Sequence, residues 1–197
     1  MKRALAAKPD MPEAFNLRGL IYASLGDDRL AEESFRRALQ INSRDADAMQ
    51  NFGWYLCQRK RYAEAQAQFE LAIAVPQYRD TARTMLTQGV CQMQAGQLDA
   101  AERALMRAYE FDPSNANAAF NLADVLYRRK DYERARFYVR RVNTNAESAN
   151  AQSLWLAARI ENRLGQLNAR QDFGAQLRRR FPGSREATAF DRGLFDE

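Results

Sequence analysis

The sequence contains no histidine, only two cysteines, nine glycines and five prolines among its 197 residues. Histidine is the commonest general base and metal ligand, and two cysteines cannot form a four-ligand zinc site by themselves. The Gly-x-Ser-x-Gly nucleophile elbow, the Gly-x-x-x-x-Gly-Lys phosphate loop and the Gly-x-Gly-x-x-Gly motif are also missing. These absences argue against the common hydrolases and nucleotide-binding enzymes. We therefore expect a protein that is not an enzyme, with no catalytic residues, no metal and no cofactor.

Long apolar segments are missing too. No apolar run approaches the roughly 18 residues that a membrane-spanning helix needs, and the opening ten residues lack the apolar core of a signal peptide. No Pro-rich or Ser/Gly-rich tract separates two parts of the chain. With 46% hydrophobic residues the chain can bury a core, so we expect one continuous domain over residues 1–197.

The basic residues outnumber the acidic ones, but they are scattered. The formal net charge is +5 and the isoelectric point is near 9.4. The densest basic clusters, at 59–61, 128–130 and 178–180, fall near expected helix ends, where cations interact favourably with exposed carbonyl groups. None of them carries a nucleic-acid-binding motif. We therefore expect a solvated role for these clusters and no nucleic-acid partner.

Small and apolar residues recur with a period of 34 residues. Glycines separated by 34 and then 36 residues define the first column, and an alanine continues it after another 34. Three further columns keep the same register. The four columns are Gly19, Gly53, Gly89 and Ala123; Ala31, Ala65, Ala101 and Ala135; Phe35, Phe69, Leu105 and Val139; and Ala38, Ala72, Ala108 and Val142.

Each repeat is expected to form two antiparallel helices joined by a short connection. In the second repeat, Met49, Phe52, Gly53 and Leu56 share one helical face. A small residue in the glycine column allows the two helices to approach closely. The expected boundaries are a partial repeat over 2–11, repeats over about 12–45, 46–79, 82–115, 116–149 and 151–183, and a capping helix over about 184–195.

The run FNLRGLIYASLGDDRLAEESFRRALQINS resembles the tetratricopeptide repeat, and the resemblance extends over roughly residues 2–182. It implies an all-α, right-handed superhelical solenoid of five repeats plus a partial N-terminal one. The partial repeat, KRALAAKPD, resembles a second helix whose first helix is missing, so we expect the natural chain to extend further upstream. Three departures stand out: Gln92 replaces an aromatic residue, VPQYRD at 75–80 adds two residues, and Gly174 replaces a large apolar residue. We expect looser packing around Gly174.

The tetratricopeptide resemblance implies that the first helix of each repeat lines a groove. We expect its apolar members to hold an apolar or aromatic peptide segment, with Arg159 available for a carboxylate or a backbone carbonyl. The alternative is that neighbouring repeats or a terminal segment cover part of this row. The residues expected to face the groove are Asn16, Leu20, Gln50, Trp54, Leu86, Val90, Phe120, Asp124, Tyr127, Trp155 and Arg159.

The two cysteines, Cys57 and Cys91, lie on the first helices of adjacent repeats. Neighbouring helices pack about 8 to 10 Å apart, so a disulfide is geometrically feasible and would add roughly 3 kcal/mol of stability. Two free buried thiols are the other interpretation, and the spacing does not choose between them. A thiol redox protein using Cys57 beside Trp54 and Tyr55 is a third hypothesis, which needs an activated thiol and a resolving partner.

A narrower resemblance covers nearly the whole chain. The runs NFGWYLCQRKRYAEAQAQFELAIAVPQY, TQGVCQMQAGQLDAAERAL and LRRRFPGS resemble the type IV pilus biogenesis family called PilW or PilF. The resemblance implies a pilotin lipoprotein on the periplasmic face of the outer membrane, which promotes localisation and multimerisation of a PilQ-type secretin.

This resemblance also implies an oxidising compartment, and hence a disulfide between Cys57 and Cys91. It places the signal peptide and lipid anchor upstream of this chain, so that contact with the membrane occurs only through the anchor. We expect a monomer whose partner is a segment of the secretin. The alternative is a generic cytosolic tetratricopeptide-repeat adaptor that binds a different peptide.

Overall fold

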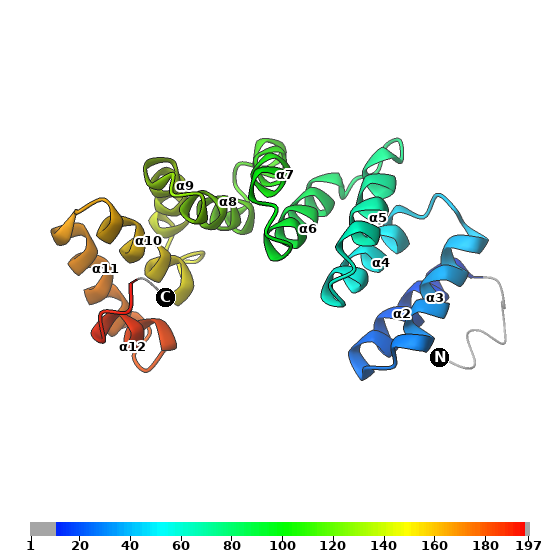
Figure 1. Ribbon diagram of the computed structural model, residues 1–197, viewed down its shortest axis with the longest axis horizontal. Helices are drawn as coiled ribbons and strands as arrows, with labels where there is room; N and C mark the ends of the chain where they lie inside the picture. The colour runs from blue at the N-terminus through cyan, green and yellow to red at the C-terminus, as the bar shows by residue number, and fades with distance from the viewer. Residues whose placement is uncertain (1–10, 196–197) are drawn as a thin grey trace. The chain divides into compact units, whose positions relative to one another are not determined.

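The chain is all-helical over residues 11–195, the part that the computed structural model describes (Figure 1). This confirms the expected fold class, whereas the partial repeat expected over 2–11 lies outside the described residues except for Met11. No helix in this range is both long and apolar enough to cross a bilayer. The helices are α2 (Pro12–Leu25), α3 (Asp28–Ile41), α4 (Ala46–Gln58), α5 (Tyr62–Ala74), α6 (Thr81–Gln94), α7 (Leu98–Phe111), α8 (Ala116–Arg128), α9 (Tyr132–Thr144), α10 (Ala151–Arg163), α11 (Leu167–Arg180) and α12 (Arg185–Asp191).

The described helices form two compact units, residues 11–97 with α2 to α6 and residues 98–195 with α7 to α12. In the first unit α2 packs against α3, and α4 packs against α5. In the second unit α8 packs against α9, and α10 packs against α11. These helix pairs are the repeats that the period of 34 residues predicts.

Side chains of Asp, Asn and Ser cap the N-termini of many of the helices. Each accepts a hydrogen bond from a backbone N–H in the first turn, which satisfies a donor that has no partner within the helix. The cap residues and their bonded amides are Asp27 with Leu30, Asp45 with Ala48, Asn115 with Ala118, Asn150 with Ser153 and Ser184 with Ala187. The capping side chains therefore help to fix where these five helices begin.

The glycine column sets the distance between the two helices of a repeat. A Cβ atom added to Gly19 would lie 2.7 Å from the Phe35 ring, and one added to Gly53 would lie 2.9 Å from the Phe69 ring. Both rings are completely buried. The first two repeats therefore each pack a phenylalanine of the second helix into the space that a glycine leaves on the first helix, which gives the close approach that the sequence predicts.

Replacing Gly53 with alanine tests this packing. We expect Gly53→Ala to lower the free energy of unfolding by about 1 to 3 kcal/mol because the buried Phe69 ring cannot move away. Helix propensity alone would raise it by about 1 kcal/mol. Urea unfolding followed by circular dichroism measures the difference, and Ala67→Gly at an exposed site of α5 reports propensity alone. A Gly53→Ala chain that is more stable than the parent would contradict the close contact.

A second glycine position recurs seven residues after the first column, where the chain leaves the first helix. Gly26 and Gly96 have φ angles of 77° and 74° there, in the left-handed region. Lys60 and Lys130 occupy the equivalent places with φ of 60° and 65°. A side chain with a Cβ atom is strained in this conformation, and glycine is not.

Glycine should therefore be favourable at Lys60. We expect Lys60→Gly to raise the free energy of unfolding by about 0.5 to 1 kcal/mol, since relief of strain outweighs the greater freedom of the unfolded chain. Lys60→Ala, which removes the charge and keeps the Cβ atom, should give no such gain. Equal stability of the two variants in urea unfolding would show that the conformation carries no strain.

The insertion at 75–80 is anchored by Tyr78. Its hydroxyl donates a hydrogen bond to the carboxylate of Asp47 on α4 at 3.0 Å, and its ring packs against a small cluster that includes Met49 and Ala72. Burial raises the pKa of Tyr78 to about 12. The two extra residues are thereby fastened to the start of α4.

The other two departures from the repeat pattern are compensated differently. Gln92, which replaces an aromatic residue, is buried and donates from Nε2 to Oε1 of Gln66 on α5 at 3.0 Å. The looser packing expected around Gly174 is wrong. The ring of Phe190 on α12 fills the space beside Gly174. A Cβ atom added to Gly174 would lie 2.1 Å from that ring, so the packing there is close.

Candidate peptide-binding surface

The first unit presents part of the expected row on three neighbouring helices, α2, α4 and α6. Leu20 on α2 is 39% exposed, and Trp54 on α4 is partly exposed while its other side packs against the core cluster. Leu86 and Val90 on α6 are also partly exposed. Asn16 accepts a hydrogen bond from the amide of Asn51 at 3.2 Å, which links α2 to α4 at one end of the row.

Two residues of the row do not face solvent. Gln50 is 5% exposed and Tyr127 is 8% exposed, so the expectation that they face an open groove is wrong. The first helices are covered on more than one side, and nine of the 13 residues of α4 are buried. Tyr127 lies under the guanidinium of Arg159, 4.7 Å from ring centroid to Cζ, and against the ring of Tyr132.

In the second unit a terminal segment covers part of the row, which was the alternative that the sequence left open. The ring of Phe195 lies 5.2 Å from that of Trp155 between centroids. Nε of Arg159 donates to the main-chain carbonyl of Phe195 at 3.2 Å. Asp124 is paired with Arg128, and Phe120 is half-buried. Trp155 and Arg159 are therefore in contact with the chain's own C-terminal residues.

Sequence reasoning missed an apolar stripe on α2. Leu17, Ile21 and Leu25 are 54%, 36% and 72% exposed. They recur every four residues and so lie on one face of the helix. The four-residue spacing is visible in the sequence and indicates one apolar face of a helix. It does not show whether that face is buried, which the packing of α3 and α4 on the opposite face decides. The stripe adjoins Leu20.

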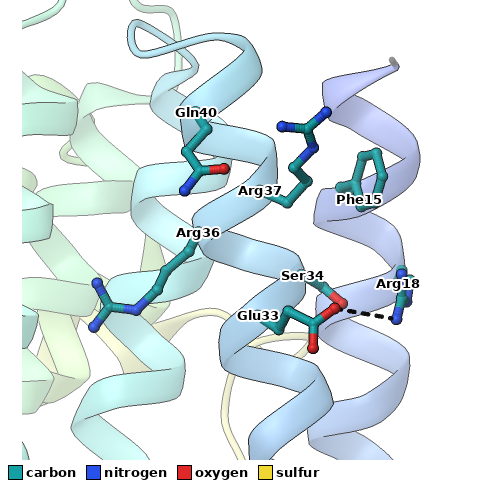
Figure 2. Close-up of a pocket in the computed structure, with 7 residues that line it drawn as sticks. All are labelled: Phe15, Arg18, Glu33, Ser34, Arg36, Arg37 and Gln40. Atoms are coloured by element: carbon teal, nitrogen blue, oxygen red, sulfur yellow. Dashed lines mark ion pairs between the residues drawn. The ribbon is translucent and has the colours of Figure 1, made fainter. Parts of the chain in front are cut away.

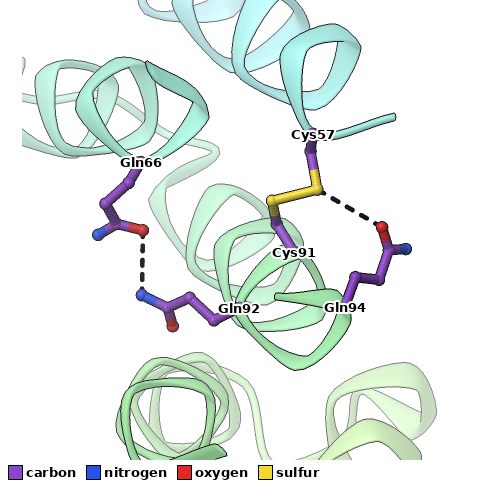
Figure 3. The surroundings of a disulfide bond; sticks show 5 residues. All are labelled: Cys57, Gln66, Cys91, Gln92 and Gln94. Carbon is purple, nitrogen blue, oxygen red and sulfur yellow. Dashed lines mark hydrogen bonds between the residues drawn. A yellow bond between two sulfur atoms is a disulfide. The ribbon is translucent and has the colours of Figure 1, made fainter. Parts of the chain in front are cut away.

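Cys57 and Cys91 are joined by a disulfide, as the narrower resemblance implies (Figure 3). Their Cα atoms are 5.9 Å apart, and both residues are buried, with exposed fractions of 1% and 4%. Oε1 of Gln94 lies 3.6 Å from Sγ of Cys57. The bond fastens α4 to α6 and thereby fixes the distance between the helices that carry Trp54 and Val90.

The disulfide should stabilise the first unit. A closed loop of this length contributes roughly 3 to 4 kcal/mol in the chain-entropy model, so Cys57→Ser with Cys91→Ser should lower the free energy of unfolding by about that amount. Guanidinium unfolding with and without a reductant measures it. The reductant should lower the midpoint of the parent chain and leave the double variant unchanged. A parent chain whose thiols react with a thiol reagent before reduction would contradict the bond.

Charged side chains near the row form pairs that hold the helices together. Arg61 at the start of α5 donates to Glu32 on α3 and to Glu64, each at 2.6 Å. The hydrogen bond from Arg61 lowers the pKa of Glu32. The hydroxyl of Tyr55 donates to the carbonyl of Asp28 at 3.0 Å, and burial raises its pKa. These groups link α3, α4 and α5.

The hollow between α2 and α3 has a volume of about 340 Å³ and charged walls (Figure 2). Arg18 faces Glu33 across it at 3.9 Å, and the guanidinium of Arg37 lies 6.0 Å from the ring centroid of Phe15. No nucleophile paired with a base lines it. Within residues 11–195 no group of three acidic or cysteine side chains is placed to hold a metal ion.

Comparisons with known proteins agree with this architecture. The tetratricopeptide-repeat family matches residues 12–45, 51–116 and 92–160. The type IV pilus assembly protein PilF of Pseudomonas aeruginosa is 27% identical over 190 residues, which cover 96% of this chain and 75% of that protein.

Two solved structures share the fold over nearly the whole chain. The crystal structure of PilW, described as a widely conserved type IV pilus biogenesis factor, is 33% identical with a TM-score of 0.87 and covers 95% of this chain and 86% of its own. The structure of Pseudomonas aeruginosa PilF is 26% identical with a TM-score of 0.83 and covers 98% and 86%. The chain therefore belongs to the PilW and PilF family of tetratricopeptide-repeat proteins of type IV pilus biogenesis.

Proposed function

We propose that this protein is a non-enzymatic pilotin. It binds a segment of the PilQ-type secretin of the type IV pilus and promotes localisation and multimerisation of the secretin in the outer membrane. Membership of the pilus biogenesis family supports a role in pilus assembly. The repeat architecture supports a binding role, because stacked helix pairs present extended surfaces to partners.

The exposed apolar surface of the first unit is the observation that carries the proposal. Leu20 and Trp54 lie on adjacent helices, and Leu17 and Leu25 extend the apolar surface along α2. Single exposed leucines are ordinary, whereas a run of them on one helix beside a tryptophan is typical of a surface that a partner covers. Tryptophan and leucine anchors suit an apolar peptide segment, and burying them would supply most of the binding free energy.

The position of the disulfide supports a rigid binding surface. Because α4 and α6 are covalently joined through Cys57 and Cys91, Trp54 and Val90 keep their spacing without a bound partner. A surface that is ordered beforehand loses less conformational entropy on binding. The same disulfide favours an oxidising compartment, and so the periplasmic face of the outer membrane over the cytosol of the adaptor alternative.

We assign the thiols a structural role. Cys57 is 1% exposed and bonded to a second buried cysteine, whereas a redox thiol needs access to its substrate. A lipid anchor upstream of this chain would hold the protein at the membrane. The protein acts as a monomer in this proposal.

Substitution of the apolar surface tests secretin binding. We expect Leu20→Asp and Trp54→Ala each to weaken binding of the purified secretin by about tenfold or more, measured by titration calorimetry. In cells that co-express the secretin, heat-resistant secretin multimers in the outer-membrane fraction should fall correspondingly.

The matched control is Leu71→Asp on α5, a leucine that is 52% exposed on a second helix. It introduces the same charge outside the row and should leave binding and multimer formation unchanged. Circular dichroism establishes that each variant is folded. Folded Leu20→Asp and Trp54→Ala chains that bind the secretin as well as the parent would show that this surface is not the binding site.

A further inference from the structure

Phe195 lies in a box of aromatic and arginine side chains that four helices of the second unit build. Its ring centroid is 5.2 Å from that of Trp155 on α10 and 5.4 Å from that of Phe190 on α12. The Phe190 ring meets it edge-on, at an interplanar angle of 86°. The guanidinium of Arg170 on α11 covers it at 5.1 Å. Offset and edge-on ring contacts with a cation over one face are favourable for an aromatic side chain.

The box also recognises the main chain. The carbonyl oxygen of Phe195 accepts a hydrogen bond from Nε of Arg159 at 3.2 Å and one from the hydroxyl of Tyr127 on α8 at 3.4 Å. A hydrogen bond from a charged donor is stronger than one between neutral groups. The site therefore contacts both an aromatic ring and the carbonyl of the same residue, as a peptide-binding site does and as simple apolar packing does not.

Phe195 reaches the box through a short segment outside any helix. The α12 helix ends at Asp191, and Gly193 then turns the chain with a φ of 70°. The N–H of Leu194 returns to the carbonyl of Ala189 at 3.0 Å. Beyond that turn, Phe195 contacts the box and packs against the buried core cluster of α10, α11 and α12. A segment of this kind can leave its site without unfolding a helix.

We propose that this box is a binding site for a partner segment that presents a phenylalanine side chain and its main-chain carbonyl, and that Phe195 occupies the site as an intramolecular competitor in the unbound protein. The box is built entirely within the second unit, and its Trp155 and Arg159 are among the first-helix residues that the sequence expects to face a partner. In that respect alone it rests on the proposed function. It adds the chemistry of the ligand, which the secretin assignment does not specify.

The tether determines how strongly Phe195 competes. A segment joined by a short linker has an effective concentration in the millimolar range. If that concentration is about ten times the dissociation constant of the segment, a partner's apparent affinity is lowered about tenfold. Removing the Phe195 ring should therefore increase the affinity for an added peptide by about that factor.

The experiment uses Trp155 as the reporter. The chain has two tryptophans, so Trp54→Phe leaves Trp155 as the only one. In this background Phe195→Ala should move the fluorescence emission to longer wavelength and increase quenching by acrylamide. The probe is a capped peptide with the sequence Asp-Arg-Gly-Leu-Phe-amide, which copies residues 191–195, and a second peptide has alanine in place of the phenylalanine.

We expect the Phe195→Ala chain to bind the phenylalanine peptide about tenfold more tightly than the parent does, with the emission returning to shorter wavelength. The alanine peptide should not bind. Adding Arg159→Met to Phe195→Ala should abolish binding, because the carbonyl loses its charged donor. Phe137→Ala, which removes a half-exposed ring on α9, is the matched control and should behave like the parent.

Equal affinity of the Phe195→Ala and parent chains, or no binding to Phe195→Ala at millimolar peptide, would overturn the proposal. A lower melting temperature of Phe195→Ala with no recovery of the emission on adding peptide would have the same meaning, since Phe195 would then be only a structural cap. No secretin is used in this experiment, so a negative result would not contradict the proposal that the first-unit surface binds the secretin. Likewise, if Leu20→Asp and Trp54→Ala do not weaken secretin binding, the proposal for the box is not contradicted.

Discussion

The close approach of the two helices of a repeat, which a small residue on the first helix allows, is the constraint on which the structure depends; in the first two repeats a buried phenylalanine of the second helix fills the space. Gly19 faces Phe35 and Gly53 faces Phe69 within van der Waals distance of the helix backbone. This contact fixes which face of the first helix is buried. The other faces of the first helix then pack on the next repeat or meet solvent.

The joint between the second and third repeats is where the chain departs most from its own period, and three local interactions compensate. The disulfide between Cys57 and Cys91 joins the two first helices. Tyr78 attaches the inserted residues to α4. Gln92 takes the place of an aromatic residue and bonds to Gln66. A covalent bond and hydrogen bonds thus replace part of the apolar packing that the regular repeat would provide.

The residues of the row differ in exposure between the two units. In the first unit Leu20 and the stripe on α2 are exposed, and Trp54 is partly so. In the second unit Tyr127 is buried, and Trp155 and Arg159 contact the C-terminal segment through Phe195. The same sequence columns therefore give an exposed apolar surface in one unit and an occupied aromatic box in the other, because α12 and the segment after it belong to the second unit.

The 34-residue period by itself determined the helical class, the pairing of the helices and the glycine-against-phenylalanine contacts, because these depend on residues at fixed spacing within one repeat. The spacing of the two cysteines placed them on adjacent first helices but left two chemical states open, since it does not fix the distance between their Cα atoms. Only the tertiary structure decided which first-helix side chains are exposed. Gln50 is buried, Tyr127 is covered by Arg159 from another helix, and Phe190 fills the space at Gly174 from a helix that lies outside the repeat pattern. Whether a side chain is buried depends on every helix that packs against it. The repeat pattern of the sequence shows only which face of its own helix the residue lies on.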